Sequence, residues 1–470
     1  MKFKISNLAQ VKEAIIEDSD LAVVVGDNGT GKTLLLEAKA LIKDYFNERI
    51  DKGISSFIDS HPNSIDVKAD WDLILKHFKE DEILDGDEKA GIDFESVEVE
   101  LRINNLDEIR TYFNTYISKL TQDVSKLIAE RILFSEDSNV KVVLLDIPEI
   151  IEEVVIMKVR VGFHRNICIL GLDTEPRKDL HSIFTMASNM EINGNEDTID
   201  SEDIEEYINR ISVKSEMYKE QLCKKIQELF IKNIYHDYFK KGPLLFLPSE
   251  RNLYMDNALR KTLNEHYMNT KLRYSEHLFN KAYLEHQDFT KRFVNRRVVG
   301  EEEEKLFEGK LSYNEHGEID CLIKEDGEVV KRELFSTKQN RLLPYLIIDT
   351  PFKRYQQIII EEPEAHLSLR SMVELINYVK MLVKEREKQV LITTHSDVFF
   401  SHLNNFLLTN DELSTKVYEL KMENNHSILE EKVKSEYGYQ IDFFTETLND
   451  LYEETIEIQQ KNHLDDNLDN

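Results

Sequence analysis

The segment Gly26–Thr33, GDNGTGKT, constrains this chain more than any other feature because it matches the pattern G-x-x-x-x-G-K-[ST]. Leu21–Val25 before it is short, apolar and β-branched, which is typical of an interior parallel strand. After it, apolar residues recur at helical spacing, at Leu34, Leu35, Ala38, Leu41, Ile42 and Tyr45. The sequence therefore predicts a strand, a glycine-rich turn and a helix in direct succession.

This succession predicts a phosphate-binding loop. Glycines let the backbone curl so that its N–H groups point at phosphate oxygens, and the helix that follows adds the positive end of its dipole. We expect Lys32 to reach the β- and γ-phosphates and the Thr33 hydroxyl to bind Mg²⁺. The predicted cofactors are ATP and Mg²⁺, and the predicted nucleotide contacts in this loop are Gly26, Asp27, Asn28, Gly29, Thr30, Gly31, Lys32 and Thr33.

A second apolar strand, Ile358–Ile360, ends in two adjacent carboxylates, Glu361 and Glu362. Mg²⁺ prefers oxygen ligands, and hydrolysis needs a second carboxylate to orient or deprotonate water. Successive strand side chains point in different directions, so two adjacent acids can serve both purposes. We expect Glu361 to hold the metal and Glu362 to polarise the attacking water. The alternative is two surface acids at a strand end.

His395 follows the next predicted strand, Val390–Thr394. From that place it could hydrogen-bond the γ-phosphate or the attacking water, so we assign it to catalysis beside Glu362. A single histidine at a strand end is often only structural. Its spacing, one helix and one strand after the paired acids, favours the catalytic interpretation.

The composition limits where and how such a chain can act. Its 470 residues carry a formal net charge of −30, which opposes non-specific binding to nucleic acid. A local basic cluster remains an alternative surface for DNA, at Lys291, Arg292, Arg296 and Arg297. The three cysteines form no C-x-x-C pair, no signal segment is visible and the apolar runs are short. These features predict a cytoplasmic protein that does not use a membrane.

Three motifs in this order resemble the ABC-type ATPases of the OLD (overcoming-lysogenization-defect) class and their RecF- and SMC-like relatives. They are the opening ISNLAQVKEAIIEDSDLAVVVGDNGTGKT, the segment IIIEEPEAHL and the segment LITTHSD. FLPSERNLY at 246–254 is similar to a proline-and-arginine strand motif of these proteins. The resemblance covers about residues 1–50 and 310–450, and the middle of the chain matches only in architecture.

The resemblance implies an α/β fold: a P-loop ABC-type ATPase head with a mixed β-sheet and a large helical insertion. We expect residues 1–50 and 310–430 to form the head, with strands from 95–170 added to it. Residues 100–300 are expected to be a mainly helical insertion or arm. Residues 431–470 are expected to form a C-terminal helical segment with an acidic tail.

The family also implies a head that dimerises on ATP, with each nucleotide contacted by a signature serine of the other head. Ser336 in FSTKQNRLLPYLIID is the matching position. Thr337 and Lys338 stand where the family has one or two glycines, which predicts slow hydrolysis or a long-lived ATP state. The resemblance thus implies a homo-oligomer, at least a dimer of heads.

OLD nucleases carry a TOPRIM domain after the ATPase, and no such acidic motif follows His395. The chain therefore resembles standalone ATPases that work with a separately encoded effector, such as those of the PARIS and Septu anti-phage systems. This implies a defence sensor or scaffold that controls a nuclease or toxin, with a phage protein or nucleic acid as possible trigger. The alternatives are a RecF- or SMC-like ATPase acting on DNA and, less favoured, a transporter subunit.

Overall fold

The computed structural model divides the chain into two compact units. The head unit comprises Met1–Phe46, Leu120–Asp146 and Lys241–Asn470, and the insertion unit comprises Asn47–Lys119 and Ile147–Lys240. The structure describes residues 1–71, 74, 94–135, 138–147, 154–164, 167–172, 181–185, 216–232, 234, 242–251, 273–292, 305–316, 318–350 and 353–466.

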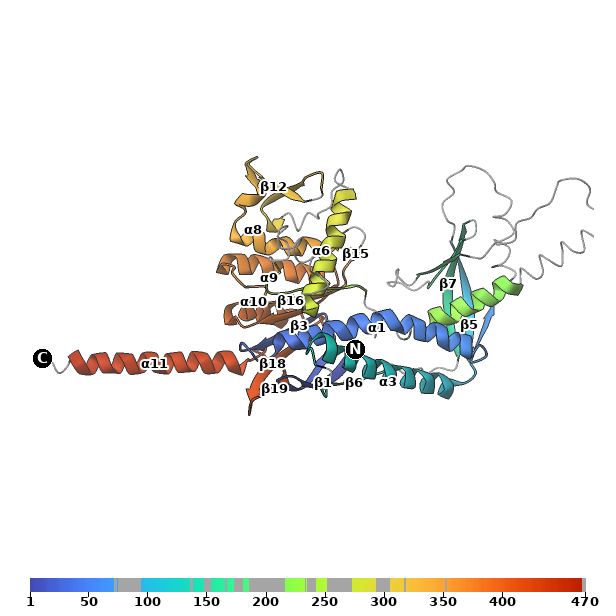
Figure 1. Cartoon of the computed structure of the whole chain (residues 1–470), viewed down its shortest axis with the longest axis horizontal. Coiled ribbons are helices and arrows are strands. Elements are labelled where there is room, and N and C mark those ends of the chain that lie inside the picture. Colours follow the sequence, from blue (N-terminus) through green and yellow to red (C-terminus); the bar gives the residue numbers. More distant parts are fainter. Residues whose placement is uncertain are drawn as a thin grey trace, which may run out of the picture. The chain divides into compact units, whose positions relative to one another are not determined.

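A mixed nine-stranded sheet forms the centre of the head unit (Figure 1). Its order is β10-β16-β17-β3-β18-β19-β2-β1-β6. The strands in that order are Leu244–Leu247, Gln357–Glu361, Gln389–Thr394, Leu21–Gly26, Thr415–Glu423, His426–Lys432, Val11–Glu17, Lys2–Leu8 and Lys141–Leu144. The first five are parallel to one another, whereas β18–β19, β1–β2 and β1–β6 pair antiparallel.

The parallel strands β3, β16 and β17 are buried on both faces, and each has a central run of apolar side chains. All residues of β3 and β16 are buried, and so are the last five of β17. In register, Ile360 of β16 pairs with Ile392 of β17, which pairs with Val23 of β3. Such continuous apolar runs are the pattern of interior parallel strands.

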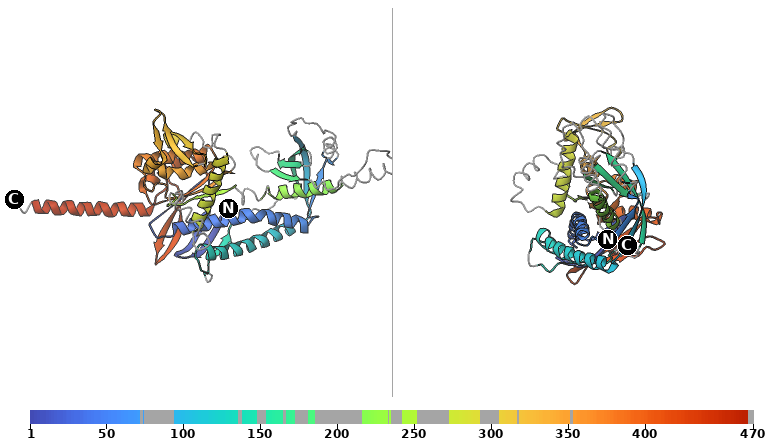
Figure 2. Two further views of the ribbon diagram at one scale, coloured as in Figure 1. Left: turned by 45° about the horizontal axis from the view of Figure 1, so that its top comes forward. Right: turned by 90° about the vertical axis from the view of Figure 1, so that its right-hand side faces the viewer.

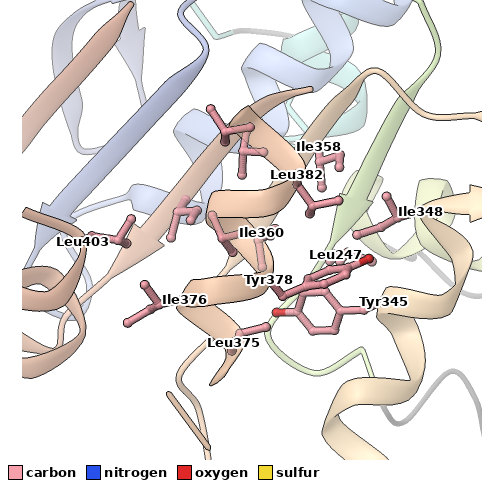
Figure 3. Close-up of a cluster of buried hydrophobic side chains, with 14 of the residues drawn as sticks. Leu247, Tyr345, Ile348, Ile358, Ile360, Leu375, Ile376, Tyr378, Leu382 and Leu403 are labelled. Carbon is pink, nitrogen blue, oxygen red and sulfur yellow. The ribbon is translucent and has the colours of Figure 1, made fainter. Parts of the chain in front are cut away.

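Helices of the head unit pack on this sheet over a shared core. Leu375 of α9 (Leu369–Lys384) and Leu403 of α10 (Asp397–Leu408) pack with Ile358 and Ile360 of β16 (Figure 3). Other head elements are α6 (Tyr274–Arg292), α8 (Thr337–Leu342), the turn η3 (Leu343–Ile347) and α11 (Asp442–Asp466). A small antiparallel sheet, β11 (Gly309–Tyr313), β12 (Ile319–Lys324) and β13 (Val329–Lys331), contributes Leu322 to this core.

The insertion unit contains a separate five-stranded antiparallel sheet. Its strands, in order, are β4 (Ile65–Ala69), β5 (Phe94–Ile103), β7 (Val154–His164), β8 (Ile167–Leu172) and β9 (His181–Thr185). Residues 216–232 are helical, and Gln227 in this helix donates to the carbonyl of Ile65 at 2.6 Å. Two long helices, α1 (Lys32–Ser60) and α3 (Leu106–Arg131), have residues in both units.

The predicted α/β fold is confirmed, and some details of the sequence prediction were wrong. Among the described strands between 95 and 170, only β6 belongs to the head sheet, whereas β5, β7 and β8 form the second sheet. Residues from 51 onward continue α1 to Ser60 and then form β4. Much of the expected helical insertion at 100–300 lies outside the described residues, as do Arg296 and Arg297. The domain boundaries stay a prediction.

Within the described part of the chain, no helix combines the length and apolar character needed to cross a membrane.

Candidate functional site

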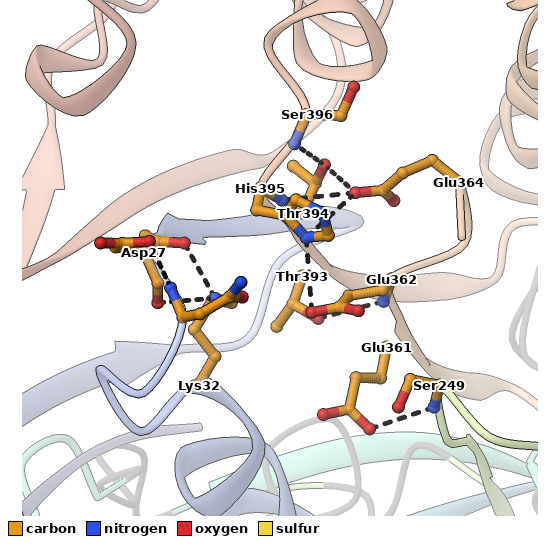
Figure 4. A network of polar contacts seen from close by, with 12 residues as sticks. Asp27, Lys32, Ser249, Glu361, Glu362, Glu364, Thr393, Thr394, His395 and Ser396 are labelled. Atoms are coloured by element: carbon orange, nitrogen blue, oxygen red, sulfur yellow. Dashed lines mark hydrogen bonds and ion pairs between the residues drawn. The ribbon is translucent and has the colours of Figure 1, made fainter. Parts of the chain in front are cut away.

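Parallel strands bring chemically different residues to one edge of the head sheet. Gly26 ends β3, Glu361 ends β16 and Thr394 ends β17. Ser249 lies two residues beyond β10. Because these strands run parallel, their carboxyl ends meet at the same edge, and Figure 4 shows the side chains gathered there.

The glycine-rich loop between β3 and α1 needs glycine for two different reasons. Gly29 and Gly31 have φ of +77° and +99°, a conformation that glycine adopts without strain. At Gly31 a Cβ would also lie 2.7 Å from Val11 Cγ2. The side chain of Gln10, in the turn after β1, donates to the Gly29 carbonyl at 3.1 Å. The loop is therefore fixed by its own backbone and by the neighbouring turn.

The Lys32 side chain lies across the loop from which it starts. Its ammonium group donates to the carbonyls of Gly26 and Asp27, at 2.8 and 2.9 Å, and the residue is 7% exposed. Burial lowers the pKa of this ammonium group, and the nearby carboxylates of Glu362 and Asp27 oppose that shift. Lys32 is thus a largely desolvated cation, which is the kind of group that attracts phosphate strongly.

Thr33 and Glu361 connect the loop with β16. The Thr33 hydroxyl donates a short hydrogen bond to Oε1 of Glu361, while Oε2 accepts from the backbone N–H of Ser249 at 3.1 Å. Glu361 is 6% exposed. The two residues assigned to the metal from sequence therefore lie in direct contact, and their oxygen atoms suit a hard cation such as Mg²⁺.

Glu362 and His395 also lie together, with Glu362 partly exposed and His395 exposed. The Glu362 carboxylate is 3.4 Å from His395 Nδ1. Glu362 has a φ of +45°, and its backbone N–H donates to Thr393 O at 3.1 Å. This left-handed turn directs the Glu362 side chain away from that of Glu361, so the two carboxylates have different surroundings.

A third carboxylate, that of Glu364, accepts hydrogen bonds from His395 and from the residue before it. It is 4% exposed and accepts from the Thr394 hydroxyl at 2.6 Å and from the His395 backbone N–H at 3.3 Å. Burial raises the pKa of the Glu364 carboxyl, and the hydrogen bond from Thr394 opposes that shift. Sequence reasoning gave Glu364 no role, although it lies within the quoted motif IIIEEPEAHL.

The structure does not bring Ser336 to these residues. Ser336 is exposed and is the N-cap of α8, where its hydroxyl accepts from the backbone N–H of Gln339 at 3.3 Å. The Gln339 side chain in turn accepts from the Ser336 backbone N–H at 2.9 Å. This capping box satisfies the serine within its own turn.

Ser249 and Arg251 hold Glu361 in place, and sequence reasoning assigned neither of them. Arg251 is completely buried and donates to the backbone carbonyls of Glu361 and Pro248, each at 3.1 Å. Arg341 of α8 donates to the Ser249 carbonyl at 3.1 Å. The only sequence signal was the FLPSER segment, because contacts over more than 90 positions leave no local pattern.

The sequence of this chain matches the family model of the AAA ATPase domain over residues 1–400. The chain belongs to this family. The match includes the glycine-rich loop, the paired carboxylates of β16 and His395, so these residues lie within an AAA ATPase domain. The buried parallel strands that carry them give this domain a P-loop ABC-type ATPase fold.

Solved structures resemble the AAA ATPase domain only remotely. An SMC head bound to the C-winged helix domain of ScpA has 16% identity and a TM-score of 0.33, covering 92% of this chain and 97% of that chain. An SMC head domain from Thermotoga maritima has 13% identity and a TM-score of 0.31, with 91% and 97% covered. A Smc head with an extended coiled coil, derived from Pyrococcus furiosus, has 13% identity and 0.31, with 92% and 95% covered. No curated protein matches the sequence.

Proposed function

We propose that this AAA ATPase binds Mg-ATP in the loop Gly26–Thr33 and hydrolyses it slowly. The observation that carries this proposal is the hydrogen bond from Thr33 to Glu361. It joins the residue after the phosphate-binding lysine to a buried carboxylate of a neighbouring strand. The alternative of two surface acids at a strand end does not predict a buried Glu361 that is hydrogen-bonded to Thr33.

Thr33 and Glu361 are the residues that would hold Mg²⁺, and their oxygen donors fit it. When bound, the metal supplies positive charge that offsets the charge of the phosphate oxygens. Lys32, whose ammonium group donates to the carbonyls of Gly26 and Asp27, contributes a second positive charge. The backbone N–H groups of the loop and of the first turn of α1 add hydrogen bonds to phosphate.

Glu362 is the residue we assign to the attacking water. Its carboxylate is 25% exposed at the side chain, so water reaches it, whereas Glu361 is held on both oxygens. The contact with His395 keeps the carboxylate near the loop. In this assignment Glu362 orients the water and accepts its proton, and His395 contacts the γ-phosphate or the water.

We further propose that two heads pair on ATP, so that Ser336 of one head contacts the nucleotide of the other. The exposure of Ser336 at the start of a helix supports this proposal. On the basis of the family resemblance, we propose that the protein acts in the cytoplasm as an anti-phage sensor or scaffold. In this role it controls a separate effector, a nuclease or a toxin. The net charge of −30 favours a protein partner over a nucleic acid.

The test is mass photometry of the wild type and of Glu362→Gln, with and without Mg-ATP, each co-expressed with the protein encoded by the adjacent gene. A complex of defined stoichiometry containing that protein supports the sensor or scaffold role. A chain that only dimerises with ATP, and binds DNA in a salt-sensitive manner, supports action on DNA instead. Absence of ATP binding in both proteins would reject the ATPase proposal itself.

A further inference from the structure

The carboxyl ends of β16 and β17, neighbouring strands of the head sheet (Figure 2), are hydrogen-bonded to each other residue by residue. The backbone N–H of Glu362, just after β16, donates to the Thr393 carbonyl at 3.1 Å. Two residues later, Glu364 accepts from the Thr394 hydroxyl at 2.6 Å and from the His395 backbone N–H at 3.3 Å. Three consecutive residues at the end of β17 are therefore bound to a three-residue segment that follows β16.

A single oxygen of Glu364 makes all of these side-chain contacts. Oε1 accepts both hydrogen bonds and lies 3.9 Å from Nδ1 of His395. Oε2 is also buried, and it has no hydrogen-bond partner among the described residues. A buried oxygen without a partner costs folding free energy, which an apolar side chain at this position would avoid. Stability alone therefore does not explain a carboxyl group at position 364.

One ring nitrogen of His395 faces two carboxyl groups of this segment (Figure 4). Nδ1 is 3.4 Å from Glu362 Oε1 and 3.9 Å from Glu364 Oε1. A carboxyl partner at Nδ1 orients the imidazole and leaves Nε2 for a second contact. The His395 side chain is 42% exposed, so packing around the ring does little to fix it. The position of the ring therefore depends on how its backbone is held.

Thr394 connects Glu364 with the start of α10. Its hydroxyl donates to Glu364 and accepts from the Ser396 backbone N–H at 3.0 Å. Ser396 is the N-cap of α10, and its side chain accepts from the Phe399 backbone N–H at 3.2 Å. His395 lies between Thr394 and Ser396, so the backbone on both sides of it is held in place.

We propose that Glu364 is a positioning residue for His395 in ATP hydrolysis, an inference that rests on the proposed function. Glu364 holds the backbone that carries His395, so that Nδ1 faces Glu362 and Nε2 is left for the γ-phosphate or the attacking water. In this role Glu364 touches neither the nucleotide nor the metal. Its loss should therefore slow hydrolysis without weakening ATP binding.

Steady-state phosphate release by the full chain separates kcat from KM in three variants. Glu364→Ala removes both hydrogen bonds and should lower kcat at least about tenfold, with KM for ATP unchanged. Glu364→Gln keeps an oxygen that accepts both hydrogen bonds, so it should retain most of the wild-type kcat. Thr394→Val has nearly the shape of threonine and removes one of the two donors, so its kcat should fall between those of the other two variants.

Double variants identify the residue through which Glu364 acts. In a His395→Ala background, Glu364→Ala and Thr394→Val should lower kcat no further, because the side chain that they position is already absent. Thr409→Val, which removes a hydroxyl at the other end of α10, is the control and should hydrolyse ATP as the wild type does.

Three results would overturn the proposal. They are a wild-type kcat in both Glu364→Ala and Thr394→Val, a full further loss of kcat in the His395→Ala background, and weaker ATP binding by Thr394→Val. A wild type that binds ATP and releases no phosphate would be a different failure, because it would reject the proposed hydrolysis and this inference with it.

Discussion

The carboxyl ends of the parallel strands and the N-terminus of α8 differ in how firmly their side chains are held. At the edge, Glu361 is buried, with both carboxylate oxygens and its backbone carbonyl hydrogen-bonded. At α8, Ser336 is exposed, and its hydrogen bonds go to Gln339 and Asn340 of its own turn. The sequence prediction assigned Glu361 to the nucleotide of its own head and Ser336 to the nucleotide of another head.

This difference indicates which part of the proposed nucleotide site is fixed within one chain and which part is not. Groups that must act on the same ligand within one chain are fixed by packing before the ligand arrives. Under the proposed pairing of heads, Ser336 acts on the nucleotide of another head, so it needs no such neighbours in its own head. Arg341 joins the two regions, because it lies in α8 and donates to the carbonyl of Ser249, whose N–H holds Glu361.

Removing the buried cation should have the largest effect. Lys32→Ala is expected to weaken ATP binding by a hundredfold or more, since a desolvated charge facing the phosphates is lost. Isothermal titration calorimetry with a slowly hydrolysed ATP analogue measures it. Lys52→Ala, an exposed lysine on the same helix, should bind as the wild type does. Equal affinity of the Lys32 variant would show that the edge does not bind nucleotide.

Neutralising Glu362 should separate binding from hydrolysis. In Glu362→Gln, ATP binding should persist while phosphate release falls by about 10²–10⁴-fold, because the amide cannot accept a proton from water. Steady-state phosphate release and nucleotide titration check the two quantities. An unchanged turnover number would remove Glu362 from its proposed role and leave His395 as the next residue to test.

Blocking α8 should affect hydrolysis and spare binding by the single chain. Ser336→Arg places a bulky side chain where a second head would approach, so turnover should be lost while calorimetric affinity of the monomer stays the same. Ser336→Ala is the control, and it costs about 1 kcal/mol of local helix stability through the lost cap. If Ser336→Arg hydrolyses ATP normally, the two regions do not serve one site.

Glu364→Gln should have the smallest effect, and it tests how the edge is built. Burial raises the pKa of Glu364, so the folded state binds this proton more tightly than the unfolded state does. Stability is therefore lost as the pH rises through the pKa of the folded state. The glutamine variant should melt about 1–2 °C higher than the wild type at pH 8 and equally at low pH. A lower melting temperature at pH 8 would show that an ionised Glu364 stabilises the edge.

The sequence predicted the parts of the molecule that local patterns encode. Continuous apolar runs identified β3, β16 and β17, and the residues after them identified the edge. Strand pairing could not be predicted in the same way, because nothing in the sequences of β5 and β6 indicates that they belong to different sheets. Arg251 was also beyond reach, since nothing in its neighbourhood indicates that a charged residue will be completely buried.

The parallel order of the head sheet has a consequence for synthesis on the ribosome. β3 emerges early, but its two neighbours, β17 and β18, begin at Gln389 and Thr415. At typical translation rates of ~5–20 residues per second, roughly 20–70 seconds pass between synthesis of the glycine-rich loop and synthesis of the strands that flank β3. A nascent chain therefore exposes β3 as an unpaired apolar segment throughout that interval. Chaperone dependence in the cell would follow from this order of emergence, whatever the stability of the finished protein.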